Sequence, residues 1–265
     1  MTVVAGVAGW PILQSLSPLI QTAWIEAAGL DAVYGFHGPE DEAGFEALVA
    51  RGRSGGLRGL NVTAPYKGLA LTLADEASQT ARASGSANLL VFEGGRAWAH
   101  STDGAGLMAA LAEQAPDFDP RGADVVVLGA GGAARAAVAV LVSSGARVGV
   151  LNRTRSRADA LAADLGARAV DIGALDTATL LINALSVPPK VDLSRLPAGA
   201  TVMDMAYRPL KTPFLAQAGA RGLTGVDGLA MLIGQARPSF EALFGRPPPE
   251  IDVRGLAVRA LEARG

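Results

Sequence analysis

Cysteine is absent from this sequence of 265 residues, and its absence excludes several kinds of chemistry at once. Without a thiol the chain forms no disulfide, no thiolate nucleophile and no cysteine-ligated metal site. The absence also fits a reducing compartment, so we expect a cytoplasmic location. Any catalysis must rest on other side chains.

The chain also lacks a charge imbalance and a long apolar run. Its 23 Lys and Arg residues face 25 Asp and Glu residues, so no overall field attracts nucleic acid or an anionic membrane. No stretch supplies the roughly 18 uninterrupted apolar residues of a membrane-spanning helix, and the first residues do not resemble an export signal. We therefore expect neither nucleic acid nor a membrane as a partner, and any bound anion must be held locally.

Apolar residues make up half of the chain, which suits two modest domains with buried cores. In the first part of the chain, β-rich runs at residues 2–8, 32–36, 57–62 and 87–92 alternate with helical patterns. One helix is predicted to begin at Ser17, with Ser-Pro supplying an N-cap and a proline at the first helical position, and Gly29 can close it. A second helix is predicted at about residues 40–51. This alternation indicates an α/β unit.

A second α/β unit is predicted to start near Asp103. A helical pattern there leads through a loop at residues 116–122 to a strand at residues 124–128, followed by a glycine turn, a helix and a further strand, as in a parallel sheet. The strands that follow are predicted at residues 147–151, 179–183, 201–205 and 223–226. After Asp227 the chain is predicted to be helical to about Phe244. A last helix is expected to pack on the first unit.

A glycine-rich loop follows the predicted strand at residues 124–128. The run from Gly129 to Ala134 reads Gly-Ala-Gly-Gly-Ala-Ala and opens an alanine-rich helix, the context that a dinucleotide fingerprint requires. Gly129 would allow the tight turn, and Gly131 would let backbone N–H groups approach a pyrophosphate at the helix N-terminus. An ordinary strand-to-helix turn is the alternative interpretation.

The end of the next strand favours NADP over NAD. NAD-binding domains normally place an acidic residue there to bond the ribose 2′-hydroxyl. This chain instead has Asn152, Arg153 and Thr154, whose guanidinium, amide and hydroxyl suit a 2′-phosphate that a carboxylate would repel. Arg155 and Arg157 are further candidates, although an arginine at the start of an exposed helix is often a solvated surface residue.

Four polar clusters occur in the first part of the chain, three of them where a predicted strand runs into a loop or helix. They lie at residues 9–18, 61–67, 85–88 and 101–104. Ligand sites of α/β proteins gather at such strand ends, so these positions suit a polar small molecule. Each cluster also has a structural interpretation: Ser17 as a helix cap, Asn61 and Thr63 as turn formers, and Asp103 as an N-cap.

Lys67 is one of only three lysines in a chain that otherwise fills its basic positions with arginine. A lysine ammonium is a compact, rotatable donor that can release a proton, whereas a guanidinium stays protonated. We therefore interpret Lys67 as a candidate catalytic acid or base, with a surface lysine as the alternative.

Taken in order, these motifs resemble the shikimate dehydrogenase family from Gly9 to beyond Gly245. The matching runs are the paired serines Ser15 and Ser17, Asn61 to Lys67 (N-V-T-x-P-x-K), Thr102 to Gly104 (T-D-G), Gly129 to Arg135 (GAGGAAR), Asn152 to Thr154 (NRT), Asp204 to Leu215 (D-x-x-Y-x-P-x-x-T-P-F-L) and Gly225 to Gln235. The resemblance implies a discontinuous α/β substrate domain, residues 1–103 and 228–265, and a Rossmann-type NADP-binding domain, residues 104–227, with the active cleft between them. The implied reaction is the reversible reduction of 3-dehydroshikimate to shikimate by NADPH, in chorismate and aromatic amino acid biosynthesis.

The same resemblance implies roles for individual residues. Lys67 and Asp103 would be the catalytic pair. The substrate would be bound by Ser15, Ser17, Asn61, Thr63, Asn88, Tyr207 and Gln235. The cofactor NADP(H) would be bound by Gly129, Ala130, Gly131, Gly132, Ala133, Asn152, Arg153, Thr154, Arg157, Asn183, Gly225 and Met231. No metal is required, and a homodimer is one possible assembly.

The sequence departs from the family pattern at three positions. Gln14 stands where the family often has His, Leu89 where it has Thr, and Ser101 where it has Asn. A relative acting on quinate or on an aminated shikimate analogue therefore stays open as an alternative. A non-catalytic NADP-binding sensor is the alternative from a different functional class.

Overall fold

The computed structural model describes residues 2–263, and the chain folds into two compact units. The first unit combines the residues up to Thr102 with Gln235–Ala260, and the second consists mainly of Asp103–Gly234. Each unit has its own sheet, so the chain is of the α/β class. Helix α9, Gly228–Phe244, begins in the second unit and ends in the first.

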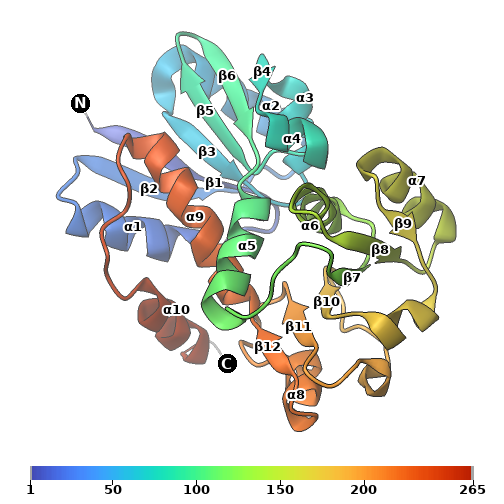
Figure 1. The fold of residues 1–265 in the computed structure, drawn as a ribbon. Helices are drawn as coiled ribbons and strands as arrows, with labels where there is room; N and C mark the ends of the chain where they lie inside the picture. The colour runs from blue at the N-terminus through green and yellow to red at the C-terminus, as the bar shows by residue number, and fades with distance from the viewer. Residues whose placement is uncertain (1, 264–265) are drawn as a thin grey trace. The chain divides into compact units, whose positions relative to one another are not determined.

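The first unit is built around a mixed six-stranded sheet (Figure 1). Its strands are β1 Val3–Ala8, β2 Ala32–His37, β3 Gly59–Val62, β4 Glu76–Ala77, β5 Leu89–Glu93 and β6 Arg96–His100. Its helices are α1 Ser17–Ala27, α2 Glu42–Arg51, η1 Gly52–Gly56, α3 Lys67–Leu73, α4 Gln79–Ser84 and α10 Val253–Glu262. The strand order is β2-β1-β3-β5-β6-β4, with β1 parallel to β2 and β3 while β5 runs antiparallel to β3 and β6.

The β5–β6 hairpin turns at Gly94 and Gly95, whose φ angles are 57° and 77°. Two successive positive φ angles match the two-residue hairpin turns that join twisted antiparallel strands. The sequence patterns predicted neither β6 nor the short β4, so these two strands of the six are a finding of the structure.

Helix α1 begins at Ser17, as predicted, but the predicted cap is wrong. The N-cap position is occupied by Leu16, in a helical conformation without a side-chain cap, and Pro18 lies within the first two helical positions. Ser15 compensates, because its Oγ accepts a hydrogen bond of 3.2 Å from the backbone N–H of Ser17. After Ala27 the chain leaves the helix through Gly29, whose φ of 62° confirms it as the closing residue.

The core of the first unit packs helices against this sheet. Phe45 of α2 stacks on Tyr66, which precedes α3, at a ring separation of 4.8 Å, and both side chains are buried. Trp24 of α1 meets Phe240 of α9 edge-on at 5.7 Å, and both are fully buried. The second half of α9 therefore belongs to this core.

The second unit is an all-parallel, doubly wound sheet (Figure 1). Its strands are β7 Asp124–Leu128, β8 Arg147–Leu151, β9 Arg168–Ala169, β10 Leu180–Asn183, β11 Thr201–Asp204 and β12 Thr224–Val226. Its helices are α5 Asp103–Gln114, α6 Gly132–Ser143, α7 Arg155–Leu165, η2 Ile172–Thr177, η3 Leu193–Arg195 and α8 Pro213–Ala220. The order β12-β11-β10-β7-β8-β9 is that of a Rossmann fold, with the switch point between β7 and β10.

Both faces of this parallel sheet are buried. Along β7, Val125 and Val127 join the core with α5, α6, α7 and the start of α9, while Val126 and Leu128 join the core with η2, η3 and α8. A strand covered on both faces reads as a continuous apolar run rather than an alternating one. The same burial explains why five of its six strands were predicted, whereas the two-residue β9 was missed.

Candidate active site

The polar clusters of the first unit meet at one edge of its sheet. The loops after β1 and β3 touch, because Trp10 N–H bonds the Ala64 carbonyl at 3.1 Å and a Cβ added to Gly9 would lie 2.4 Å from Thr63. The N–H of Ala87 bonds the Lys67 carbonyl at 2.9 Å, which attaches the segment before β5 to the start of α3. The structure therefore gathers segments far apart in sequence at the carboxyl ends of the parallel strands.

The side chains that the sequence assigned to substrate differ in exposure within this edge. Ser17 is buried, at the start of α1, whereas Ser15, Thr63 and Lys67 are partly exposed. Lys67 opens α3. Partly exposed hydroxyl and ammonium groups at the ends of strands are of the kind that contacts a polar ligand.

A buried hydrogen-bond network joins Asn88, Thr102 and Gln235. The Oδ1 of Asn88 accepts from Thr102 N–H at 2.7 Å, and its Nδ2 donates to Thr102 Oγ1 at 2.9 Å and to Gln235 Oε1 at 3.1 Å. Thr102 Oγ1 also lies 3.2 Å from Gln235 Oε1. These hydrogen bonds join three segments of the first unit: the loop before β5, the residues that follow β6, and helix α9.

Asn61 is buried, and its side chain makes three hydrogen bonds within the first unit. Its Oδ1 accepts from Tyr34 OH at 2.8 Å, and its Nδ2 donates to Ser239 Oγ at 2.9 Å and to the Asn88 carbonyl at 3.3 Å. Sequence reasoning did not single out Tyr34 or Ser239. Ser239 was detectable in principle, because it lies one helical turn beyond Gln235.

Two further residues adjoin this network in the sequence. Asp103, which follows Thr102 in the chain, is buried and opens α5 of the second unit. His100, at the end of β6, is partly buried, and burial lowers its pKa below the usual value. His100 is therefore neutral near pH 7, and we assign it no role.

In the second unit, the glycine loop has the geometry that a pyrophosphate requires. Gly129 follows β7 with φ of 111°, which favours glycine, and Gly131 is the N-cap of α6. A Cβ added at Gly131 or Gly132 would meet nothing within 4 Å, and both residues are exposed, as is required of backbone that a ligand approaches. Ala130 and Ala133, on either side of these glycines, are partly exposed, so the middle of the loop borders solvent while Gly129 and Ala134 are buried.

The arginines in the segment after β8 differ in their contacts. Arg155 is engaged within the unit: its guanidinium bonds Asp159 at 3.0 Å, Asp171 at 3.1 Å and the Ala169 carbonyl at 3.1 Å. Within residues 2–263, by contrast, Arg153 and Arg157 take part in no ion pair, and both are exposed. Two guanidinium groups at the end of β8 are thus available to an anion.

Asn152 and Thr154 shape the backbone beside these arginines. The Nδ2 of Asn152 donates to the Thr154 carbonyl at 2.9 Å, and Thr154 is the exposed N-cap position of α7, without a side-chain cap. The turn is therefore held by Asn152, while the Thr154 hydroxyl is left at the surface beside Arg153.

The remaining predicted cofactor residues lie in strands β10 and β12 and in helix α9. Asn183, buried at the end of β10, donates to Asp204 Oδ1 at 2.9 Å and accepts from Leu185 N–H at 3.2 Å. Asp204 in turn accepts from Thr212 Oγ1 at 2.7 Å, which secures the segment that carries the partly exposed Tyr207. Gly225 is exposed in β12, whereas Met231 of α9 packs in the core against the sheet with 9% exposure.

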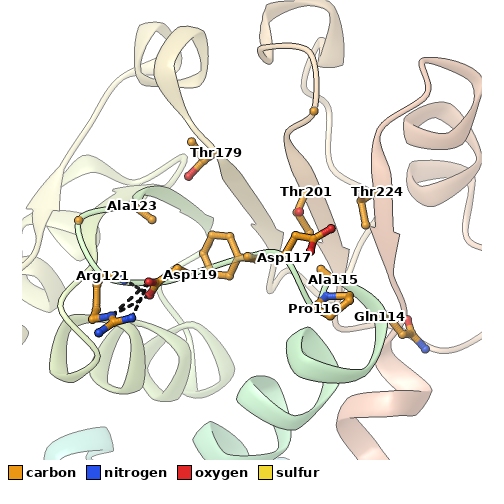
Figure 2. A pocket seen from close by; sticks show the side chains of 13 residues that line it. Gln114, Ala115, Pro116, Asp117, Asp119, Arg121, Ala123, Thr179, Thr201 and Thr224 are labelled. Carbon is orange, nitrogen blue, oxygen red and sulfur yellow. Dashed lines mark hydrogen bonds and ion pairs between the residues drawn. The ribbon is translucent and has the colours of Figure 1, made fainter.

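A separate hollow of about 600 Å³ lies in the second unit at the amino ends of its strands, the edge opposite the glycine loop. Figure 2 shows Thr179, Thr201 and Thr224 lining it together with the loop between α5 and β7. Several of its polar groups bond within the protein: Arg121 pairs with Asp119 at 2.9 Å, and Thr179 Oγ1 donates to the Asp124 carbonyl. No predicted site residue lines this hollow.

Comparisons with known proteins find relatives that match nearly the whole chain. A family model described as shikimate dehydrogenase substrate binding domain matches residues 7–90, and one described as shikimate / quinate 5-dehydrogenase matches residues 110–187. A shikimate dehydrogenase (NADP(+)) of Caulobacter vibrioides is 51% identical, over 98% of this chain and 96% of the relative. Among the residues that the structure describes, no helix is long and apolar enough to span a membrane.

Solved structures support the same assignment. The shikimate 5-dehydrogenase of Thermus thermophilus, in complex with NADP(H) and shikimate, matches with a TM-score of 0.91 and 34% identity, over 98% of this chain and all of that one (100%). A quinate dehydrogenase of Corynebacterium glutamicum in complex with NAD matches with a TM-score of 0.85 and 28% identity, over 100% and 99% of the two chains. Sequence, domain models and fold agree, and the chain belongs to the shikimate dehydrogenase family.

Proposed function

We propose that this protein catalyses the reversible NADPH-dependent reduction of 3-dehydroshikimate to shikimate, a step of aromatic amino acid biosynthesis. The observation that carries the proposal is the gathering of hydroxyl, amide and ammonium side chains at the carboxyl edge of the first sheet, in a chain 51% identical to a shikimate dehydrogenase (NADP(+)). A ring acid with several hydroxyls is the kind of ligand that such a set binds.

The substrate carboxylate is assigned to the hydroxyls of Ser15 and Ser17, at the start of α1. The N-terminus of this helix carries a partial positive charge, which favours an anion. The ring hydroxyls are assigned to Thr63, Asn88 and Gln235. Tyr207, carried by the segment that Asp204 secures, completes the proposed set.

NADP is assigned to the second unit. The open backbone at Gly131 and Gly132 suits the pyrophosphate, and Arg153 and Arg157 suit the 2′-phosphate. Asn152 and Thr154 shape that turn, while Asn183, Gly225 and Met231 are proposed to border the rest of the cofactor. When bound, NADPH supplies the hydride.

The protein's contribution to the chemical step is assigned to Lys67 and Asp103. Hydride addition turns the ring carbonyl into an alkoxide, so a donor placed at that oxygen stabilises the charge as it grows. Lys67 is proposed as this donor and as a source of the final proton. Asp103 is proposed to orient the ammonium and to bond a ring hydroxyl.

The serines can be tested by their effect on KM. Ser15→Ala together with Ser17→Ala should raise KM for shikimate and leave kcat nearly unchanged, because carboxylate contacts alter little as hydride moves. Steady-state kinetics with saturating NADP measures this. If KM of the double variant equals that of the parent, the hydroxyls act only in the local structure, as Ser15 does toward Ser17 N–H.

One assay separates the candidate functions. The purified protein is supplied with shikimate or quinate and with NADP or NAD, and cofactor reduction is followed. The proposal requires shikimate with NADP to give the highest kcat/KM. Higher kcat/KM with quinate would indicate the paralogue that Leu89 and Ser101 left open, and binding of NADP without turnover would indicate a sensor.

A cytoplasmic location and a homodimer are also proposed. Strand β2 is an edge of the first sheet and exposes Val33 and Phe36, at 52% and 41%, a surface that a second copy would cover. Light scattering of the purified protein measures the oligomeric state, and a monomer at all concentrations would contradict the dimer.

A further inference from the structure

Tyr34 and Ser239 each hydrogen bond to the amide of Asn61, within the polar network of the first unit. Both side chains are buried, at 7% and 0% exposure, and they lie on opposite sides of Asn61. Neither belongs to a motif at a strand end. Their contacts nevertheless lead directly to residues assigned to substrate.

The amide of Asn61 has one orientation in this network. The Asn88 carbonyl can only accept, so the Nδ2 of Asn61 is directed to it and the Oδ1 accepts from the Tyr34 hydroxyl. Burial raises the pKa of the Tyr34 hydroxyl well above its usual value, so that hydroxyl keeps its proton. The Nδ2 therefore faces Ser239 Oγ and the Asn88 carbonyl. A flipped amide would place Oδ1 against the Asn88 carbonyl oxygen, two acceptors without a proton between them, and would lose the donor contacts with Asn88 and Ser239.

Ser239 links the amide of Asn61 to the hydroxyl of Thr102. The only proton of Ser239 is directed to the Gln235 carbonyl at 3.0 Å, so its oxygen accepts from Asn61 and is an acceptor for Thr102 Oγ1 at 3.3 Å. Thr102 Oγ1 in turn accepts from Asn88 Nδ2. The hydroxyl of Thr102 is thus a donor toward Ser239 or toward Gln235 Oε1, and an acceptor toward Asn88.

The network also sets the direction of the Gln235 amide. Its Oε1 receives hydrogen bonds from Asn88 Nδ2 and Thr102 Oγ1, so its Nε2 is turned away from both. The Nε2 of a glutamine amide is a hydrogen-bond donor of the kind that hydroxyl and carboxylate oxygens accept. The orientation is established by protein contacts alone.

We propose that Tyr34, Asn61 and Ser239 are positioning residues for substrate binding: they hold Thr102, Asn88 and Gln235 in the orientation that meets the ring acid. This inference rests on the proposed function and extends it. It gives Asn61 a different role from direct substrate contact, because its hydrogen-bonding groups are directed to Tyr34, Ser239 and Asn88. The proposed action is on binding, through pre-organisation of the donors.

The test uses two near-isosteric variants, Tyr34→Phe and Ser239→Ala. Each should raise KM for shikimate about three- to tenfold, the effect of one hydrogen bond, and keep kcat within about twofold. KM for NADP should not change. Because both variants act through the amide of Asn61, the double variant should raise KM by less than the product of the single effects.

Matched controls separate positioning from general stability. Tyr66→Phe removes a buried hydroxyl that donates to the Pro39 carbonyl, and Ser84→Ala removes a buried hydroxyl bonded to the Ala81 and Ser86 carbonyls. Loss of folded enzyme lowers apparent kcat without altering KM, so the controls should retain the parent KM.

The outcomes are distinct. Network variants with the parent KM, or control variants with an equal rise in KM, would overturn the positioning role while leaving the activity intact. A parent enzyme that oxidises no shikimate with NADP would overturn the proposed function and this inference with it.

Discussion

Replacing Lys67 by alanine should lower kcat about 10²- to 10⁴-fold and raise KM for shikimate far less. The ammonium is proposed to meet an oxygen whose negative charge grows only as hydride arrives, so its contribution appears in the transition state. Lys67 is partly exposed at the first position of α3, where its side chain can reach a ligand while its carbonyl holds Ala87. Steady-state kinetics, with NADP affinity measured separately, reports both quantities.

Three further variants sharpen this result. Lys190→Ala removes an exposed lysine of the second unit and should leave kcat unchanged. Lys67→Arg should restore only part of the activity, because a guanidinium can stabilise an alkoxide but does not release a proton near neutrality. Asp103→Asn should also be impaired. If Lys67→Ala keeps kcat within about threefold of the parent, far short of acid–base effects, Lys67 has no part in the chemical step.

The second unit was predictable because its strands are buried on both faces. The predicted strands at residues 124–128 and 147–151 are β7 and β8, and the helix predicted from Asp227 to about Phe244 is α9. A parallel strand inside a doubly wound sheet leaves a continuous apolar run bounded by glycine turns, a signal that requires no knowledge of distant contacts.

The first unit was less predictable because part of its sheet is antiparallel and short. Strand β6 carries the exposed Arg96 and the half-buried Trp98, so it shows no continuous apolar run. A signal was present in Gly94 and Gly95 between two β-forming segments, a pattern typical of a hairpin. The N-cap error at Ser17 is of another kind, since the backbone N–H of Ser17 is satisfied by Ser15 instead.

The residues of the candidate site also differ in how well the sequence predicted them. Residues near strand ends, such as Asn88 and the glycine loop, were predicted as site residues because strand ends are recognisable in sequence, and their roles stay predictions. Tyr34 and Ser239 were not, because their partner Asn61 is 27 positions away from one and 178 from the other. Hydrogen bonds over such separations arise only from the tertiary fold.

Arg153→Ala should weaken the binding of NADP about ten- to hundredfold, the range expected for one charge-assisted contact. The binding of NAD should change little. Arg153 is exposed at the end of β8 and, within residues 2–263, takes part in no ion pair, so its charge is available to a 2′-phosphate that NAD lacks. The parent should accordingly prefer NADP. Kinetics with both cofactors at saturating shikimate measures the preference.

Arg155→Ala is the matched control, because it removes the same charge two positions away. Arg155 is already bonded to Asp159, Asp171 and the Ala169 carbonyl, so its replacement should reduce NADP affinity much less. Net charge changes equally in the two variants, which removes long-range attraction as an explanation of any difference between them. Equal losses in both variants would show that general charge, rather than a contact at Arg153, favours the phosphate, and equal kcat/KM of the parent with NADP and NAD would refute the phosphate site itself.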